Sequence, residues 1–125
     1  GESNDQLTLH RERKSFGTER TLLKDTTDHG ILTGYLDSFS EELERMLKKR
    51  SLAARTVTLK LRDSEFNTIT KSVTLRDYFN KKEEIYPIAL QLFEETMEES
   101  PIRLIGLTVS HLEKTDRIYK QLKLF

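Results

Sequence analysis

The period of the apolar residues changes along this chain, and that change limits the possible folds more than any other feature. Between residues 31 and 47, apolar side chains recur every four positions, with further apolar residues beside them, which is close to the period of a helix with one buried face. Between residues 55 and 75 they alternate with polar side chains, which is the period of a strand with one buried face. A second helical stripe and a further apolar run follow. The pattern therefore predicts helices and strands within one mixed domain.

The predicted elements follow the order strand, helix, strand, strand, helix, strand. The strands are expected at residues 17–24, 55–62, 68–75 and 102–109, and a second helical stripe covers 85–97. The side chains of Thr26, Thr27 and Asp28 suit the cap at the start of the first helix. The apolar stripe of that helix is expected on Ile31, Leu32, Tyr35, Leu36, Phe39, Leu43, Met46 and Leu47.

The start of the second helix contains a conflict. Asn80 followed three residues later by Glu83 is a pair typical of a helix start. Pro87 has no N–H group to donate within a helix, so the helix either begins near Glu84 or kinks at Pro87.

Each helix has one apolar stripe, so both helices are expected to cover the same face of the sheet. The predicted fold is α+β with the order β-α-β-β-α-β: a four-stranded, mainly antiparallel sheet with both helices on one face. The opposite face is then left to solvent or to a partner. Strand alternation places Thr56, Thr58, Lys60, Arg62, Thr68, Thr70, Ser72 and Thr74 on that face.

Composition excludes several classes of protein. The 125 residues suit one domain, and the absence of cysteine excludes disulfides, zinc-cysteine sites and thiol catalysis. His10, His29 and His111 are far apart and show no spacing typical of metal ligands. No apolar run approaches the roughly 18 residues of a membrane span, and no signal peptide is visible. We expect a cytoplasmic monomer without a membrane partner.

The formal net charge is zero, with 21 basic and 21 acidic residues, but the charges are unevenly distributed. Residues 54–76, which contain the predicted strands 55–62 and 68–75 and are expected to form a hairpin, carry a net charge of plus three. Residues 81–100, which contain the second helix, carry a net charge of minus four. Such a separation can orient a domain toward a polyanion, although a solvated mixed-charge sheet without a partner accounts for the charges equally well.

Three segments of the chain resemble one known family. Residues 13–21, Arg-Lys-Ser-Phe-Gly-Thr-Glu-Arg-Thr, are similar to the opening of the C-terminal little finger domain of Y-family DNA polymerases of the DinB type, with Phe16 in place of the more usual Ile or Val. Residues 69–72 resemble an element of its third strand, and residues 103–107 resemble the start of its last strand. The three segments occur in the family's order and spacing, and the resemblance extends from about residue 11 to 125.

The resemblance implies that the domain grips duplex primer-template DNA in the major groove, mostly through phosphates. It also implies contacts at the start of the first strand, beside the junction with the thumb domain. Short hydroxyls and cations on adjacent exposed strands supply the chemistry that phosphate binding needs. The expected DNA-binding residues are Lys14, Ser15, Thr58, Lys60, Thr70, Lys71, Ser72, Thr74 and Arg103. Lys71 departs from the alternation of the exposed set, so it lies at a strand margin or a bulge, or points toward the helices.

The resemblance further implies that this chain is a fragment of a translesion polymerase that acts in DNA repair. In that family the fingers, palm and thumb precede this domain, and the palm binds two magnesium ions for nucleotidyl transfer. The acidic pairs 41–42, 94–95 and 98–99 fall on the expected outer faces of the helices and do not form such a site. We therefore expect no catalytic residue, metal or cofactor in this chain.

The last five residues, Gln-Leu-Lys-Leu-Phe, look like the peptide with which bacterial proteins bind the sliding clamp, and only the middle residue departs from that pattern. An extended peptide of this kind presents a Gln amide and apolar anchors to a groove. The expected clamp-binding residues are Gln121, Leu122, Leu124 and Phe125. The expected organisation is a disordered lead or tag remnant at 1–10, a DNA-binding domain at 11–114 and a flexible tail at 115–125.

Two other functions stay open. One is a small ferredoxin-like module that binds proteins and has no role with DNA. The other is a sheet that binds single strands or RNA, which such sheets do by stacking bases on exposed aromatic residues. None of the eight residues expected on the open face is aromatic, which disfavours the second function.

Overall fold

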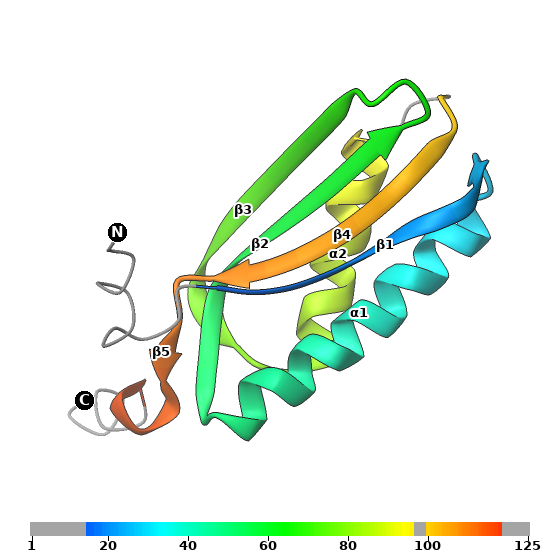
Figure 1. Cartoon of the computed structure of the whole chain (residues 1–125). Helices are drawn as coiled ribbons and strands as arrows, with labels where there is room; N and C mark the ends of the chain where they lie inside the picture. The colour runs from blue at the N-terminus through cyan, green and yellow to red at the C-terminus, as the bar shows by residue number, and fades with distance from the viewer. Residues whose placement is uncertain (1–14, 97–99, 119–125) are drawn as a thin grey trace, which may run out of the picture.

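The computed structural model describes residues 15–96 and 100–118. Four long strands form one antiparallel sheet in the order β1-β4-β2-β3 (Figure 1). Helix α1 packs mainly on β1 and β4, and α2 packs on β2 and β3, so both helices cover the same face. The predicted fold class is confirmed. The elements are β1 (Ser15–Thr26), α1 (His29–Lys49), β2 (Leu52–Asp63), β3 (Thr68–Phe79), α2 (Lys82–Thr96), β4 (Ile102–Ser110) and β5 (Glu113–Lys114).

Helix α1 begins where the capping residues predict, but its buried stripe differs from the expected one. Asp28 Oδ1 accepts hydrogen bonds from the N–H groups of Gly30 and Ile31 at 2.8 and 3.3 Å. Ile31 was expected in the stripe, but it is 49% exposed. A spacing of four residues drifts by about 40° per step around a helix, so a stripe built only on that spacing leaves the buried face. The buried apolar line follows mixed spacings of three and four, through Leu32, Leu36, Phe39, Leu43 and Leu47.

The start of α2 differs in detail from the one expected. Glu84, not Glu83, accepts a hydrogen bond from the Asn80 N–H, at 3.3 Å. The helix begins at Lys82 and includes Pro87. Pro87 is exposed, so the carbonyl group that it leaves without an intrahelical donor lies on the side of the helix that water reaches.

The start of α2 is fastened to the last turns of α1. Glu44 Oε1 accepts a hydrogen bond from the Lys82 N–H at 2.6 Å, and the Lys82 ammonium lies 3.0 Å from Asp37. The bond from the Lys82 N–H lowers the pKa of Glu44 below its usual value. The neighbouring Asp37 carboxylate raises the pKa of the Lys82 side chain. Glu44 therefore acts as a cap for α2 that comes from a different helix.

Replacing this carboxylate is expected to destabilise the domain. Glu44→Ala leaves the Lys82 N–H without its partner and should reduce the free energy of unfolding by about 1 kcal/mol. Because the pKa of Glu44 is lowered in the folded state, its contribution is present above the ordinary Glu pKa and is lost as the pH falls below it. Urea denaturation at neutral and acidic pH measures the difference, with Glu94→Ala on the exposed face of α2 as the control. Equal stability of the two variants at neutral pH would contradict this role.

The chain after β4 contains structure that the sequence did not predict. β5 pairs with the first residues of β2, Leu52 and Ala53. Thr115 was expected to begin a flexible tail, yet its N–H and its hydroxyl donate to the Ser51 carbonyl at 3.0 and 3.3 Å. The expected lead at 1–10, the acidic pair at 98–99 and the clamp-binding residues 121–125 lie outside the described residues.

Candidate nucleic-acid interface

The sheet face opposite the helices, which we call the open face, follows from the strand register. Val57, Leu59 and Leu61 of β2 belong to the buried core under the helices, so the residues that alternate with them face away. The predicted alternation of β2 and β3 is confirmed, and the pairing extends it to β1 and β4. From β1 through β4 and β2 to β3, the four rows are Ser15-Ser110-Thr56-Thr74, Gly17-Thr108-Thr58-Ser72, Glu19-Gly106-Lys60-Thr70 and Thr21-Leu104-Arg62-Thr68.

Polar side chains on the open face bond one another across β2 and β3. The hydroxyls of Thr58 and Ser72 are 2.8 Å apart, and Arg62 Nε donates to the Thr68 hydroxyl at 3.0 Å. Such cross-strand pairs hold the side chains in place on a flat surface. A hydroxyl has one donor and two acceptor positions, so each retains capacity for a ligand after one such bond.

Thr56 departs from the expected exposure. It lies on the open face as predicted, but it is only 6% exposed. Its hydroxyl lies 2.8 Å from that of Thr74 and 2.6 Å from Nδ1 of His111. His111 follows β4 with a φ of 57°, in the left-handed region. His111 is therefore a neighbour of the open face that sequence alternation could not indicate, because it lies outside the regular strand.

The structure brings together most of the residues predicted to bind DNA. Thr58, Lys60, Thr70, Ser72 and Thr74 lie on β2 and β3 of the open face, and Ser15 lies in its outer row on β1.

Three other predicted residues do not join this cluster. By strand alternation Lys71 faces the helices, where its ammonium lies 3.1 Å from Glu95 of α2. Arg103 forms an ion pair with Asp25 at the end of β1. Lys14 lies outside the described residues.

The centre of the open face combines Lys60 with residues that the sequence patterns did not assign to that face. A hollow of about 260 Å³ lies over β1, β4 and β2. Across it, the Lys60 ammonium lies 3.5 Å from Glu19 Oε1. These residues come together because β1 pairs with β4 and β4 pairs with β2. Local sequence patterns do not predict such pairings between distant segments. The hollow is lined by Gly17, Thr18, Glu19, Lys60, Gly106 and Thr108.

Acidic residues concentrate on the helices, as the segment charges predicted. Glu41 of α1 and Glu94 and Glu95 of α2 are exposed, and hydrogen bonding to Lys71 lowers the pKa of Glu95. Glu42, also expected to be exposed, is half-buried and accepts a hydrogen bond from the Thr18 hydroxyl at 3.2 Å. Within residues 15–96 and 100–118, no three His, Asp or Glu side chains form a group that could hold a metal ion. No helix in that part of the chain is long and apolar enough to cross a membrane.

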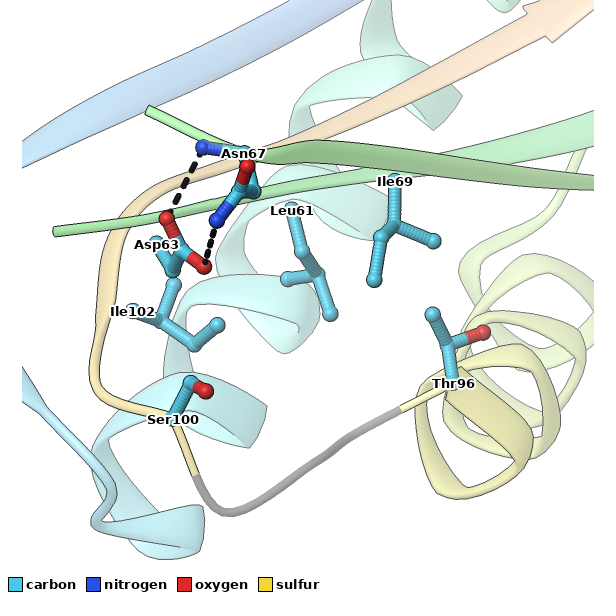
Figure 2. Close-up of a pocket in the computed structure, with 7 residues that line it drawn as sticks. All are labelled: Leu61, Asp63, Asn67, Ile69, Thr96, Ser100 and Ile102. Atoms are coloured by element: carbon cyan, nitrogen blue, oxygen red, sulfur yellow. Dashed lines mark hydrogen bonds between the residues drawn. The ribbon is translucent and has the colours of Figure 1, made fainter. Parts of the chain in front are cut away.

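A second, smaller cavity lies between the β2–β3 turn and the end of α2 (Figure 2). Asp63 closes the turn: its carboxylate accepts from the backbone N–H of Asn67 at 2.9 Å and from the Asn67 side-chain amide at 3.1 Å. These bonds lower the pKa of Asp63. The cavity measures about 20 Å³, which is room for about one water molecule, so it is part of the packing of the turn and does not suit a ligand.

The strand order, with two helices on one face and a polar open face, defines an α+β domain of the little finger type. The chain belongs to the impB/mucB/samB family C-terminal domain, whose model matches residues 13–124. This membership confirms the family resemblance seen in the three sequence segments.

Two curated relatives are DNA polymerases IV from different bacteria. DNA polymerase IV of Listeria monocytogenes serotype 4a (strain HCC23) is 43% identical over 114 residues, which are 90% of this chain and 32% of that protein. DNA polymerase IV of Staphylococcus epidermidis (strain ATCC 35984) is 35% identical over 126 residues, or 100% of this chain and 35% of that protein. The chain thus spans about a third of the length of these relatives.

Solved structures share the fold. The complex of the β-clamp processivity factor and the little finger domain of PolIV aligns with a TM-score of 0.64 and 24% identity, over 77% of this chain and 86% of that chain. The post-insertion binary complex of Dbh DNA polymerase aligns with a TM-score of 0.70 and 17% identity, over 80% of this chain and 29% of that chain. At these identities the two likenesses support the fold alone.

Proposed function

We propose that this domain holds duplex primer-template DNA on its open face, through backbone phosphates and without sequence preference. The observation that carries the proposal is the chemistry of that face: cross-bonded Thr and Ser hydroxyls with Lys60 and Arg62 among them. Phosphate contacts need hydroxyl donors and cations on an accessible surface, and they carry no sequence information. The acidic helices lie on the other side of the sheet, so the charge separation favours approach of DNA by the open face.

The open face also weighs against the other functions. None of the residues in its four rows is aromatic, whereas sheets that bind single strands stack bases on aromatic side chains. A ferredoxin-like module that binds only proteins is distinguished by experiment, because such a module would not bind duplex DNA in a salt-dependent manner.

The wider role follows from the family and is part of the same proposal. The relatives are DNA polymerases, so we assign this domain to a translesion polymerase that acts in DNA repair. Nucleotidyl transfer with magnesium belongs to the other two thirds of such a protein, and this chain alone catalyses no nucleotide addition. Residues 121–125 tether the polymerase to the sliding clamp; a related little finger has been solved with a β-clamp.

A pair of lysine variants tests the DNA-binding face. Lys60→Ala should weaken duplex binding roughly fivefold at low salt, because one phosphate contact is lost. Lys71→Ala removes the same charge from the adjacent strand, but its side chain pairs with Glu95 on the helix side and should leave binding nearly unchanged. Fluorescence anisotropy with a labelled duplex measures both.

Both lysines are at the surface, so thermal unfolding should show stabilities within about 1 kcal/mol of the parent domain. Equal losses of affinity for the two variants would place the DNA elsewhere than on the open face.

A further inference from the structure

Glu19 lies at the centre of the open face, where a negative charge opposes the proposed function. It is the only acidic residue in the four rows of that face. Its side chain is 54% exposed, and its Oε1 lies 3.5 Å from the Lys60 ammonium. One of the two cations in these four rows is thus already paired with a carboxylate of the same domain.

The ion pair runs from β1 to β2 across the intervening strand β4, and a glycine makes this possible. Glu19, Gly106 and Lys60 form one row of the sheet. A Cβ atom at position 106 would lie 2.9 Å from Glu19 Cβ, which is closer than side chains tolerate. Gly106 therefore lets the Glu19 side chain lie over β4 toward Lys60.

The surroundings of the pair form a polar hollow. A Cβ atom at Gly17 would lie 2.7 Å from the Thr108 hydroxyl, so any other residue at position 17 would displace that hydroxyl. Within the described residues, the Thr108 hydroxyl has no hydrogen-bond partner. A free hydroxyl beside an ammonium group is a combination that binds a phosphate oxygen.

We propose that Glu19 is an internal counter-ion that occupies the place of a DNA phosphate, and that Lys60 exchanges the Glu19 carboxylate for a backbone phosphate when duplex DNA binds. This inference rests on the proposed function. It assigns one phosphate to the hollow, with Lys60 and Thr108 as donors. The exchange weakens the grip, because Glu19 loses its partner and repels the incoming phosphate. A moderated grip suits a domain that must release and rebind duplex as it moves.

The exchange has a measurable signature in salt dependence. When Lys60 leaves Glu19 for a phosphate, the freed carboxylate takes up a cation from solution, which offsets one of the counterions released from the DNA. Glu19→Gln keeps the shape of the side chain and removes the charge. It should tighten duplex binding roughly fivefold at low salt and steepen the slope of log affinity against log salt by about one.

A matched control shows whether tighter binding comes from this local exchange or only from the higher net positive charge of the variant. Glu95→Gln breaks an ion pair of the same kind on the helix side, where the Lys71 ammonium lies 3.1 Å from Glu95. Both variants change the net charge equally. We expect Glu95→Gln to shift affinity by less than about twofold.

A double-mutant cycle tests whether Glu19 acts through Lys60. In a Lys60→Gln background, Glu19→Gln should no longer steepen the salt slope and should give at most half of its gain in log affinity. An equal gain in both backgrounds, or equal effects of Glu19→Gln and Glu95→Gln, would overturn the exchange. These outcomes would leave the proposed function, duplex binding by the open face, unaffected. That function is contradicted only if the parent domain shows no salt-dependent duplex binding.

Discussion

Raising the monovalent salt from about 50 to about 200 mM should weaken duplex binding by this domain roughly 15-fold. The open face presents Lys60 and Arg62, and the family resemblance adds Lys14, which precedes Ser15 in the sequence. About three phosphates are neutralised in this way, and the Glu19 carboxylate freed from Lys60 takes up one cation, so the slope of log affinity against log salt should lie near minus two. Isotherms by anisotropy at four or more salt concentrations measure the slope directly.

Duplexes of different sequence but equal length are the control for this titration. Phosphates are the same in all of them, so affinities should agree within about threefold at each salt concentration. An affinity that does not change with salt would remove the phosphate-contact proposal. A strong dependence of affinity on DNA sequence would indicate direct contacts to base edges in place of phosphate contacts. The open face would then have to supply paired hydrogen-bond donors and acceptors to a single base pair.

Much of the fold was predictable because local pattern and tertiary structure agree. The two-residue alternation on either side of the 63–67 turn predicted the β2–β3 hairpin, and the observed register pairs Thr58 with Ser72 and Lys60 with Thr70. The Asp28 cap and the helix that it starts were also local features. Errors arose where a contact from another element decides the structure. Glu44 of α1 caps α2, and no pattern near residue 80 contains that information.

The candidate site was only half predictable, for the same reason. Alternation placed the residues of β2 and β3, whose pairing is a hairpin and therefore local. Strands β1 and β4 join this sheet through pairings between distant segments, so Glu19 and Thr108 could not be assigned to the open face from the sequence alone. Lys71 broke the alternation already in the sequence, and its contact with Glu95 gives the physical reason. The family resemblance supplied the function, while the structure supplied the geometry around Lys60.

Binding to the sliding clamp should depend on the C-terminal peptide. Deleting residues 121–125 is expected to abolish binding to a bacterial sliding clamp and to leave duplex binding unchanged. These five residues, Gln-Leu-Lys-Leu-Phe, resemble a clamp-binding peptide, in which apolar side chains dominate a small interface. The intact chain should bind the clamp with a dissociation constant on the order of micromolar, since a short peptide gives up conformational entropy when it is ordered.

Two single substitutions within the tail distinguish the contribution of its apolar anchors to clamp affinity from that of its variable middle position. Phe125→Ala removes an apolar anchor and should weaken clamp binding at least about tenfold, because truncating an anchor in a groove costs well over 1 kcal/mol. Lys123→Ser changes only the middle position, which is the one that departs from the clamp-binding pattern, and should preserve or improve binding, so it shows that the loss is specific to the anchor. Calorimetric titration of the clamp into the parent domain, the deletion and both substitutions measures all four affinities. If the deletion bound as well as the parent, the clamp contact would have to lie on the folded domain, and the likeness of the peptide to a clamp-binding motif would have no functional meaning.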